Sequence, residues 1–294
     1  MKSDSPVTNI SEFLERIRNI RKKWEVKDHE ELWFRGEQEK YDTFLVPKIY
    51  RGLNIKEKPD QDFFLKEYDL YDEFQRLCDK FIKGEISEEN YDWDSYILMQ
   101  NHNAPTRLLD WTDGALIAVH FAIRDKLTNT NESKNPIIYI LNPDNDVLRE
   151  KTDESKEIEK VKEDWKQFVQ KQKGRGLNDE WWEEAYIPFD EEDLEEIDIP
   201  YPPLLLRSPH ITSRLGSQRS RMIFFGKDPW WFQENGDESF LQEIEIDWGS
   251  CKQIMIELRD CGITESVIFP DLDGLGKEMD QFWKVLFDDY RKKS

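Results

Sequence analysis

Residues 100–123 read QNHNAPTRLLDWTDGALIAVHFAI, and this stretch restricts the possible folds of the chain more than any other. Leu108, Leu109 and Trp111 need a core, whereas Arg107 and Asp110 need water or charged partners. We predict a short strand over LLDWT at the edge of a core, and a buried helix over ALIAVHFAIRD directly after it. The stretch therefore combines packing with a second, polar task.

Other segments show clear helical or strand patterns. Apolar residues recur at helical spacing over 10–24 and 61–83, which predicts two amphipathic helices. Strands are predicted at ELWFRGEQ, which ends in a turn at Gly36, and at 137–141, 222–225, 240–246 and 266–270. The resulting fold class is α+β, a single globular domain with a small mixed or antiparallel β-core flanked by helices.

The domain organisation follows from composition. We expect an N-terminal helix within 1–28, a core formed by 29–145 and 201–294, and an acidic helical insertion over 146–200 within the same domain. No apolar run reaches the roughly 18–20 residues of a membrane span or resembles a signal peptide, so we expect a cytoplasmic protein without membrane contact. Three scattered cysteines suggest neither a disulfide framework nor a zinc site.

Charge is distributed unevenly along the chain. The net charge of −21 would repel a nucleic-acid backbone if it were spread over the whole surface. Residues 207–227 contain no acidic residue, but they contain several basic ones: Arg207, Arg214, Arg219, Arg221 and Lys227. With Gly216 available for close backbone approach, this segment predicts an anion site in preference to a solvated basic loop.

Several polar residues allow two interpretations. Arg35 is either a solvated residue at a strand end or a ligand contact, and Arg107 either forms a structural pair with Asp110 or binds phosphate. His102 is either a general acid or base or a hydrogen-bonding loop residue, whereas His120 in the apolar helix is expected to be a core histidine. DLDGLG (271–276) lacks the oxygen ligands of a calcium loop and is expected to be a turn before the last helix, so no metal is predicted.

Five motifs occur in an order that resembles the FRG domain, named for its Phe-Arg-Gly. They are WFRGE, LVPKIYR, QNHNAPTRLLDWTDGALIAVHFA, SRLGSQRSRMIF and VIFPDLDGLGKEM, and together they span roughly residues 30–285. The family usually has Gln-His-Tyr-Gly-x-Pro-Thr where this chain has QNHNAPT, with the histidine displaced by one position.

The resemblance also implies a function, because the order of parts is similar to that of ADP-ribosyltransferases. In that layout Arg35, Thr112 and Gln218 take the main catalytic positions, with NAD as substrate. An amide cannot accept a proton, so transfer would need another base, such as His102, Asp110 or an acid of the acceptor itself. The implied nucleotide-binding residues are Arg35, Gly36, Gln100, Arg107, Arg214, Arg219 and Arg221.

Three functional classes remain open from the sequence. The first is an NAD-using transferase or glycohydrolase, for which the family resemblance suggests a toxin or anti-phage context and a protein or nucleic-acid acceptor. The second is a non-catalytic module that binds nucleotide or nucleic acid. The third is a nuclease-like hydrolase, for which only scattered carboxylates are available.

Overall fold

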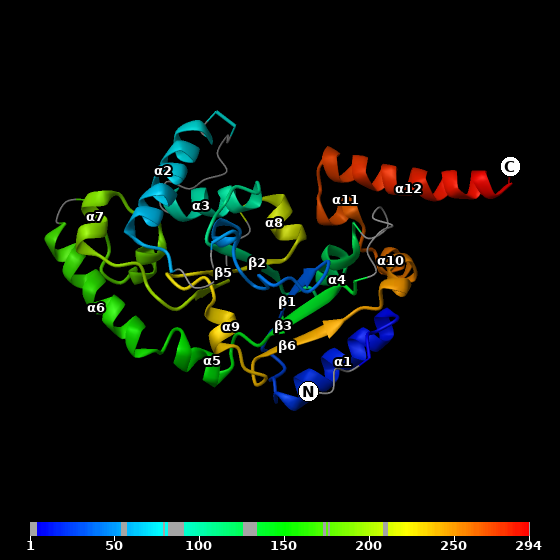
Figure 1. Ribbon diagram of the computed structural model, residues 1–294, viewed down its shortest axis with the longest axis horizontal. Helices are drawn as coiled ribbons and strands as arrows, with labels where there is room; N and C mark the ends of the chain where they lie inside the picture. The colour runs from blue at the N-terminus through cyan, green and yellow to red at the C-terminus, as the bar shows by residue number, and fades with distance from the viewer. Residues whose placement is uncertain are drawn as a thin grey trace.

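Six strands form one sheet in the order β4-β5-β2-β1-β3-β6 (Figure 1). The computed structural model describes residues 5–53, 58–78, 80–81, 91–125, 134–172, 175, 177–207 and 211–293. All pairs of neighbouring strands are antiparallel, which confirms the α+β class. The strands are β1 Trp33–Glu37, β2 Leu108–Thr112, β3 Ile137–Leu141, β4 Leu204–Leu206, β5 Ser220–Phe224 and β6 Leu241–Glu245.

The sheet is weakly joined at its centre. Strands β1 and β2 register only at Phe34 and Thr112, whereas β1 and β3 register at five residue pairs and so do β2 and β5. After Thr112 pairs with Phe34, the two strands separate toward Glu37 and Asp110. The sheet therefore consists of two three-stranded halves with an opening between them.

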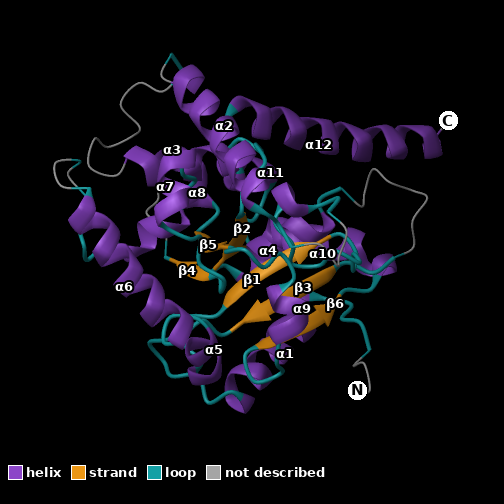
Figure 2. Cartoon of the chain, turned by 60° about the vertical axis from the view of Figure 1, so that its left-hand side comes forward, coloured by secondary structure: helices purple, strands orange, loops and turns teal. Residues whose placement is uncertain are grey.

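Three helices cover one face of the β1-β3-β6 half (Figure 2). They are α1 Ile10–Lys23, α4 Ala115–Ile123 and α10 Cys251–Asp260. Helix α1 begins where the Asn9 side chain accepts a hydrogen bond from the Glu12 N–H. Helix α4 packs so closely on β1 that a Cβ on Gly36 would lie 1.9 Å from the Ala118 carbonyl oxygen. Glycine at this position is therefore required by packing.

The opposite face is covered by an aromatic cluster. It contains Trp33, Trp111 and Tyr139 from the strands. The short helices η1 Lys48–Tyr50 and α9 Trp231–Asn235 contribute further members of this core. Successive side chains along a strand point to opposite faces of the sheet. Leu109 and Trp111, the sequence neighbours of Asp110, therefore belong to this aromatic cluster.

Helical elements surround the β4-β5-β2 half. Helices α2 Gln61–Cys78, α3 Tyr91–Asn101 and α8 Ser213–Ser217 come from the core sequence, and residues 146–200 form α5 Asp146–Lys151, α6 Lys156–Lys171, η2 Trp182–Tyr186 and α7 Glu191–Glu196. This segment has a small core of its own around Trp165 and Phe168. It also packs against β5 through Ile158 and Tyr186. The segment expected as an insertion is thus helical and contacts the sheet.

Two expectations at the C-terminal end are wrong. Residues 266–270 do not form a strand, because Glu265–Ile268 is the short helix α11, which follows η3 Trp248–Ser250 and α10. A short apolar run cannot by itself distinguish a strand from a buried helical turn. DLDGLG is not a turn either, because α12 Leu272–Lys293 begins within it, where the Asp271 carboxylate accepts from the Gly274 N–H at 2.7 Å.

The other helices predicted from the sequence are present, but the second is shorter than expected, because residues 80–81 form a turn. The helix expected over 61–83 ends at Cys78, and residues 79, 82 and 83 lie outside the described ranges. Within those ranges, none of the helices has the length and apolar character needed to traverse a membrane.

Candidate functional site

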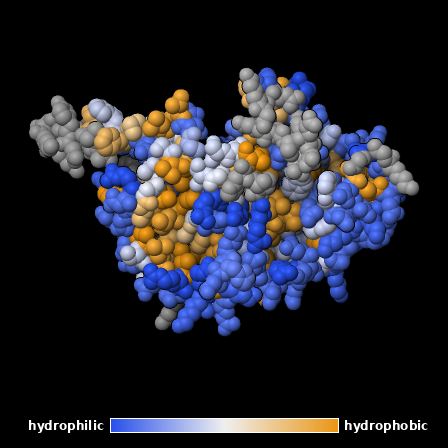
Figure 3. All heavy atoms as spheres, turned by 180° about the vertical axis from the view of Figure 1, so that it is seen from behind, coloured by the Kyte–Doolittle hydropathy of each residue, from blue (hydrophilic) through white to orange (hydrophobic). Residues whose placement is uncertain are grey.

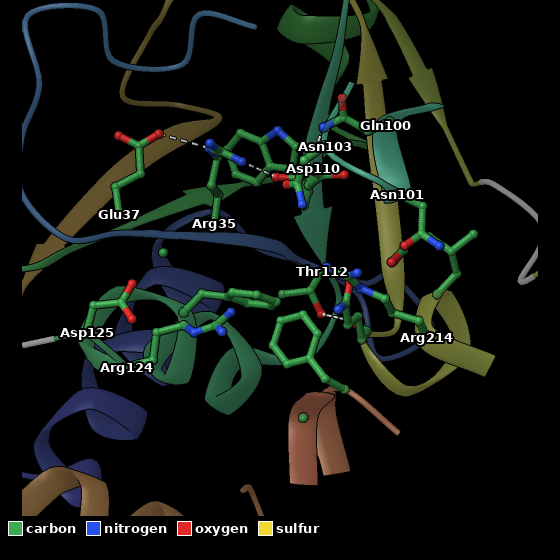
Figure 4. Close-up of a pocket in the computed structure, with 18 of the residues that line it drawn as sticks. Arg35, Glu37, Gln100, Asn101, Asn103, Asp110, Thr112, Arg124, Asp125 and Arg214 are labelled. Atoms are coloured by element: carbon green, nitrogen blue, oxygen red, sulfur yellow. Dashed lines mark hydrogen bonds and ion pairs between the residues drawn. The ribbon is translucent and has the colours of Figure 1, made fainter. Parts of the chain in front are cut away.

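A pocket of about 590 Å³ opens where β1 and β2 separate. Its walls come from both strands, from α3, α4 and α8, and from the start of α12. Figure 4 shows the side chains of Arg35, Asp110, Thr112, Arg124 and Arg214 around one opening. Seven of the residues predicted from sequence line it: Arg35, Gly36, Gln100, Asp110, Thr112, Arg214 and Gln218.

Arg35 bridges the gap between the two halves of the sheet. Its Nε donates to the Glu37 carboxylate at 2.9 Å, and its Nη1 donates to the Asp110 carbonyl oxygen at 2.7 Å. These bonds lie where backbone pairing between β1 and β2 has stopped. The Phe-Arg-Gly triplet thus has three tasks: Phe34 packs in the core, Arg35 spans the opening, and Gly36 lets α4 approach.

Asp110 is one of five carboxylates that line the pocket, together with Glu37, Asp125, Asp271 and Asp273. Its side chain opens onto the cavity and accepts from the Gln100 amide at 2.5 Å, while Gln100 in turn accepts from the Thr106 hydroxyl. Although Asp110 is accessible from the cavity, the protein atoms packed around its carboxylate raise its pKa by desolvation, and the Arg35 charge and the Gln100 hydrogen bond only partly oppose this. Asp110 therefore binds a proton more readily than an ordinary aspartate.

Thr112 and Gln218 are coupled across the pocket. The Thr112 hydroxyl donates to the Gln218 carbonyl oxygen at 2.7 Å and accepts from the Gly114 N–H at 3.0 Å. This hydroxyl is therefore committed to holding the start of α4 against the loop before β5. The Gln218 side-chain amide lies 3.5 Å from the Ile268 carbonyl oxygen, which is a long and weak contact.

Two arginines of the pocket have no carboxylate partner among the described residues. Arg51 donates its Nε to the Val46 carbonyl at 3.1 Å, and Arg214 has a buried Nε without a hydrogen-bond partner. Burial lowers the pKa of both guanidinium groups, further lowered for Arg51 by the charge of Arg35. An unpaired, partly desolvated guanidinium favours an anion in its vicinity.

Three basic side chains lie around the ring of Phe269 at one side of the pocket. The Arg124 and Arg214 guanidinium carbons lie 4.4 and 4.6 Å from the ring centroid, and the Lys277 ammonium lies 5.8 Å from it. Arg124 is neutralised by the buried Glu265, with which it forms an ion pair. Burial alone would raise the Glu265 pKa, but hydrogen bonding from His120 and the charge of Arg124 lower it.

The pocket wall also contains other polar atoms with unused hydrogen-bonding capacity. The Trp111 indole N–H and the Glu37 Oε2 are buried and have no partner within the described part of the chain. Buried polar groups in native proteins are normally satisfied, so unpaired atoms beside a cavity are positions where a bound ligand or water can form hydrogen bonds. Together with the Arg214 Nε–H they provide two donors and one acceptor.

Arg107 was predicted to bind nucleotide or to pair with Asp110, and both expectations are wrong. The side chain is fully buried, and its Nε contacts both Glu67 carboxylate oxygens at 2.8 and 2.7 Å. The remaining guanidinium nitrogens donate to the carbonyl oxygens of Phe225 and Tyr186. Glu67 lies forty residues away in sequence, so local spacing could not reveal this partner.

Three other predicted residues also lie outside the pocket lining. Arg219 pairs with Asp113, and Arg221 pairs with Asp113 and with Glu31. The hydrogen bond from Arg221 lowers the Glu31 pKa to about 2. His102 is exposed in the turn after α3 and does not line the pocket, although its neighbours Asn101 and Asn103 do. The basic segment is thus divided, with Arg214 facing the pocket and the others paired on the surface.

Sequence reasoning missed several pocket residues: Glu37, Arg51, Asn101, Asn103, Arg124, Phe269 and Lys277. Each belongs to one of the quoted motifs or lies within two residues of one, so proximity to a motif was the available signal. Asn103 has a φ of 61°, a conformation that asparagine adopts more readily than most residues. Within the described ranges, there is no group of three or more His, Cys, Asp or Glu side chains that could hold a metal ion.

Comparison with known proteins identifies one family. Residues 30–131 match the family model of the FRG domain, which confirms the resemblance over this range. The matched range contains β1 with Arg35 and the whole QNHNAPTRLLDWTDGALIAVHFA stretch, but not Arg214, Gln218 or Phe269. Searches among curated proteins and among solved structures return no match.

Proposed function

The chain carries an FRG domain over residues 30–131, and from this premise we propose that its pocket binds NAD and cleaves the bond between nicotinamide and ribose. The observation that carries the proposal is the unpaired state of Arg51 and Arg214 on the walls of one cavity, among the described residues. The products are free nicotinamide and an ADP-ribosyl group that passes to water or to a macromolecular acceptor.

The two arginines suit the pyrophosphate of a dinucleotide. Guanidinium forks bind phosphate oxygens bidentately, and they do so most strongly where water is partly excluded. In a chain with a net charge of −21, attraction of a polyanion must come from such a local arrangement. The pocket volume of about 590 Å³ lies within the roughly 300–1,000 Å³ typical of ligand sites.

The reaction requires little beyond positioning and a proton acceptor. Nicotinamide leaves as a neutral group while the ribose C1′ becomes cationic, and water or an acceptor hydroxyl then forms the new bond to C1′. Asp110 opens onto the cavity and has a raised pKa, so it is the group that takes the proton of the attacking hydroxyl. Preorganised dipoles around C1′ supply the remaining stabilisation.

Other predicted residues act as positioning groups in this scheme. The Thr112 hydroxyl has a donor and an acceptor partner already, so it holds the loop of Gln218 and does not attack. Gln218 offers an amide for the ribose hydroxyls, because an amide binds hydroxyl groups but does not accept a proton. His102 takes no part, because it lies outside the pocket lining.

The test is incubation of the protein with labelled NAD, alone and with cell lysate, followed by measurement of free nicotinamide and of labelled macromolecules. Asp110→Asn is expected to lower turnover by about 10²–10⁴-fold, the usual contribution of a general base. His102→Ala is the matched control and retains activity. Absence of nicotinamide release at any protein concentration, with NAD still bound, would leave a module that only binds the nucleotide.

A further inference from the structure

Among the side chains of helix α12 that the structure describes, contacts with the body lie near its start. Its Glu278 carboxylate accepts from the Ser266 N–H at 2.8 Å, and a Cβ on Gly274 would lie 2.0 Å from the Phe269 carbonyl oxygen. Beyond these turns, Figures 1 and 2 show the helix running away from the rest of the molecule to the C-terminus. At 22 residues it is the longest helix of the described chain.

The helix carries large hydrophobic side chains into solvent. Met279, Phe282 and Trp283 are 51%, 52% and 61% exposed. The rear view in Figure 3 shows hydrophobic side chains on this projecting helix at the upper left. Among the side chains of α12 that the structure describes, the exposed hydrophobic ones are Leu272, Leu275, Met279, Phe282, Trp283 and Phe287. An apolar stripe of this extent marks a surface that another molecule covers.

The spacing of these residues indicates what covers them. Leu272, Leu275, Met279 and Phe282 follow one another by three, four and three residues, and the sequence continues with Leu286 four positions on. Alternating steps of three and four place side chains along the seam of a two-helix coiled coil. The stripe therefore suits a helix of similar length lying along it.

Charges along α12 select the direction of that helix. Its first half has three acidic residues, Asp273, Glu278 and Asp280, against Lys277 alone. Its second half has four basic residues, Lys284, Arg291, Lys292 and Lys293, against Asp288 and Asp289. In a parallel pair of identical helices, like charges would lie side by side at both ends. In an antiparallel pair, the basic end of each helix lies beside the acidic beginning of the other.

We propose that α12 pairs antiparallel with α12 of a second copy of this chain, forming a homodimer. One self-complementary stripe is then buried on both copies, as in most two-fold dimers. Because Asp271 and Asp273 also line the pocket, residues 291–293 of the second copy lie next to the rim of the proposed NAD site. The dimer stands independently of that activity, since it rests on α12 alone.

The test is the mass of the full chain in solution by light scattering or sedimentation equilibrium. Wild type is expected at twice 35.4 kDa, and the double variant Met279→Glu, Phe282→Glu is expected at 35.4 kDa. Leu70→Glu is the matched control, because Leu70 is an exposed apolar residue on α2, and it remains dimeric. Wild type that stays monomeric up to about 100 µM, or a double variant that stays dimeric, overturns the proposal.

Cross-linking tests the direction of pairing. In a Cys261→Ser background, which removes the exposed native cysteine, Trp283→Cys near the helix centre is expected to form a disulfide-linked dimer, and Leu275→Cys is not. Efficient cross-linking of Leu275→Cys would indicate a parallel pair and contradict the proposal. Monomeric wild type that floats with phosphatidylserine vesicles would assign the stripe to a lipid surface instead.

Discussion

Arg107 and Arg214 were both predicted from the sequence to bind nucleotide, yet their surroundings in the folded chain differ completely: Arg214 lines the pocket and Arg107 does not. Arg107 is fully buried and uses its guanidinium on Glu67 and on two backbone carbonyls. Burial alone would lower the Arg107 pKa, but the charge of Glu67 raises it above its ordinary value. Arg214 has no such partner among the described residues, and burial lowers its pKa.

The contrast separates a scaffold arginine from a binding arginine by a physical criterion. Where every donor of a guanidinium has an acceptor in the folded chain, no capacity remains for a ligand. Where a guanidinium faces a cavity with unpaired donors, the folded chain has paid part of the desolvation cost before the ligand arrives. The following predictions test this distinction, beginning with the largest expected effect.

Removing Arg107 should be the most damaging change to stability. Arg107→Ala leaves the Glu67 carboxylate buried at 3% exposure without its cation, and breaking such a pair costs about 3–5 kcal/mol. Urea denaturation measures the loss. The double variant Arg107→Met, Glu67→Met replaces the pair by apolar groups and should recover most of it. An unchanged urea midpoint for Arg107→Ala would refute the scaffold role.

Removing Arg214 should affect ligand binding and leave stability nearly unchanged. Arg214→Ala is expected to weaken NAD or ADP-ribose binding by about 1.5–3 kcal/mol, the range for hydrogen bonds to charged groups. Calorimetric titration gives the affinity, and thermal melting should show a shift in stability below about 0.5 kcal/mol. A large loss of stability without loss of affinity would place Arg214 with Arg107 in the scaffold.

Glu184 is a half-buried carboxylate with no ion-pair partner among the described residues, and its titration should show the same effect of desolvation. Burial, with repulsion from Asp92 and Glu183, raises the Glu184 pKa from 4.5 to about 7. Between these values the folded protein holds a proton that the unfolded chain has lost, so stability contributed by this group falls as pH rises from about 4.5 to about 7.

Glu184→Gln removes the loss of stability at high pH, because glutamine does not titrate. The variant should exceed wild type by about 1–2 kcal/mol at pH 8, after allowance for solvent screening, and should match it at pH 4. Urea denaturation at the two pH values measures both differences. A constant difference across the range would mean that Glu184 does not titrate as its surroundings imply.

Arg219 provides the smallest expected effect. Its side chain is 60% exposed and paired with Asp113 outside the pocket lining, and exposed ion pairs contribute about 0.2–1 kcal/mol. Arg219→Ala should therefore leave NAD affinity unchanged and lower the urea midpoint only slightly. A tenfold loss of affinity would return this residue to the binding set predicted from the sequence.

The sequence predicted correctly those features that depend on residues close together in the chain. The strand over LLDWT and the helix after it were both predicted correctly. Four residues taken from continuous motifs also line one cavity, as expected: Arg35, Asp110, Thr112 and Gln218. Sequence reasoning failed for the pairing of Arg107 with Glu67, because that contact depends on how α2 packs over the sheet. β4 was not predicted, because its three leucines carry too little pattern to indicate a strand.

The cationic side of the pocket was hidden for a similar reason. Phe269 and Lys277 lie in a motif that appeared to be a strand followed by a turn, and only the folded chain brings them to Arg124 and Arg214. The spacing of residues in the sequence indicates which side chains are neighbours within one helix or strand. The basic residues around Phe269 come from several elements that are distant in the sequence. Such a cluster becomes visible only from tertiary contacts.

The most direct test of the account is a crystal structure of the protein grown with ADP-ribose, the part of NAD that remains after nicotinamide has left. The account predicts density between β1 and β2, with phosphate oxygens within hydrogen-bonding distance of the guanidinium groups of Arg51 or Arg214. It also predicts that the guanidinium of Arg107 remains on Glu67. Phosphate density bound only by Arg219 and Arg221, or a pocket without ligand at saturating ADP-ribose, would contradict it.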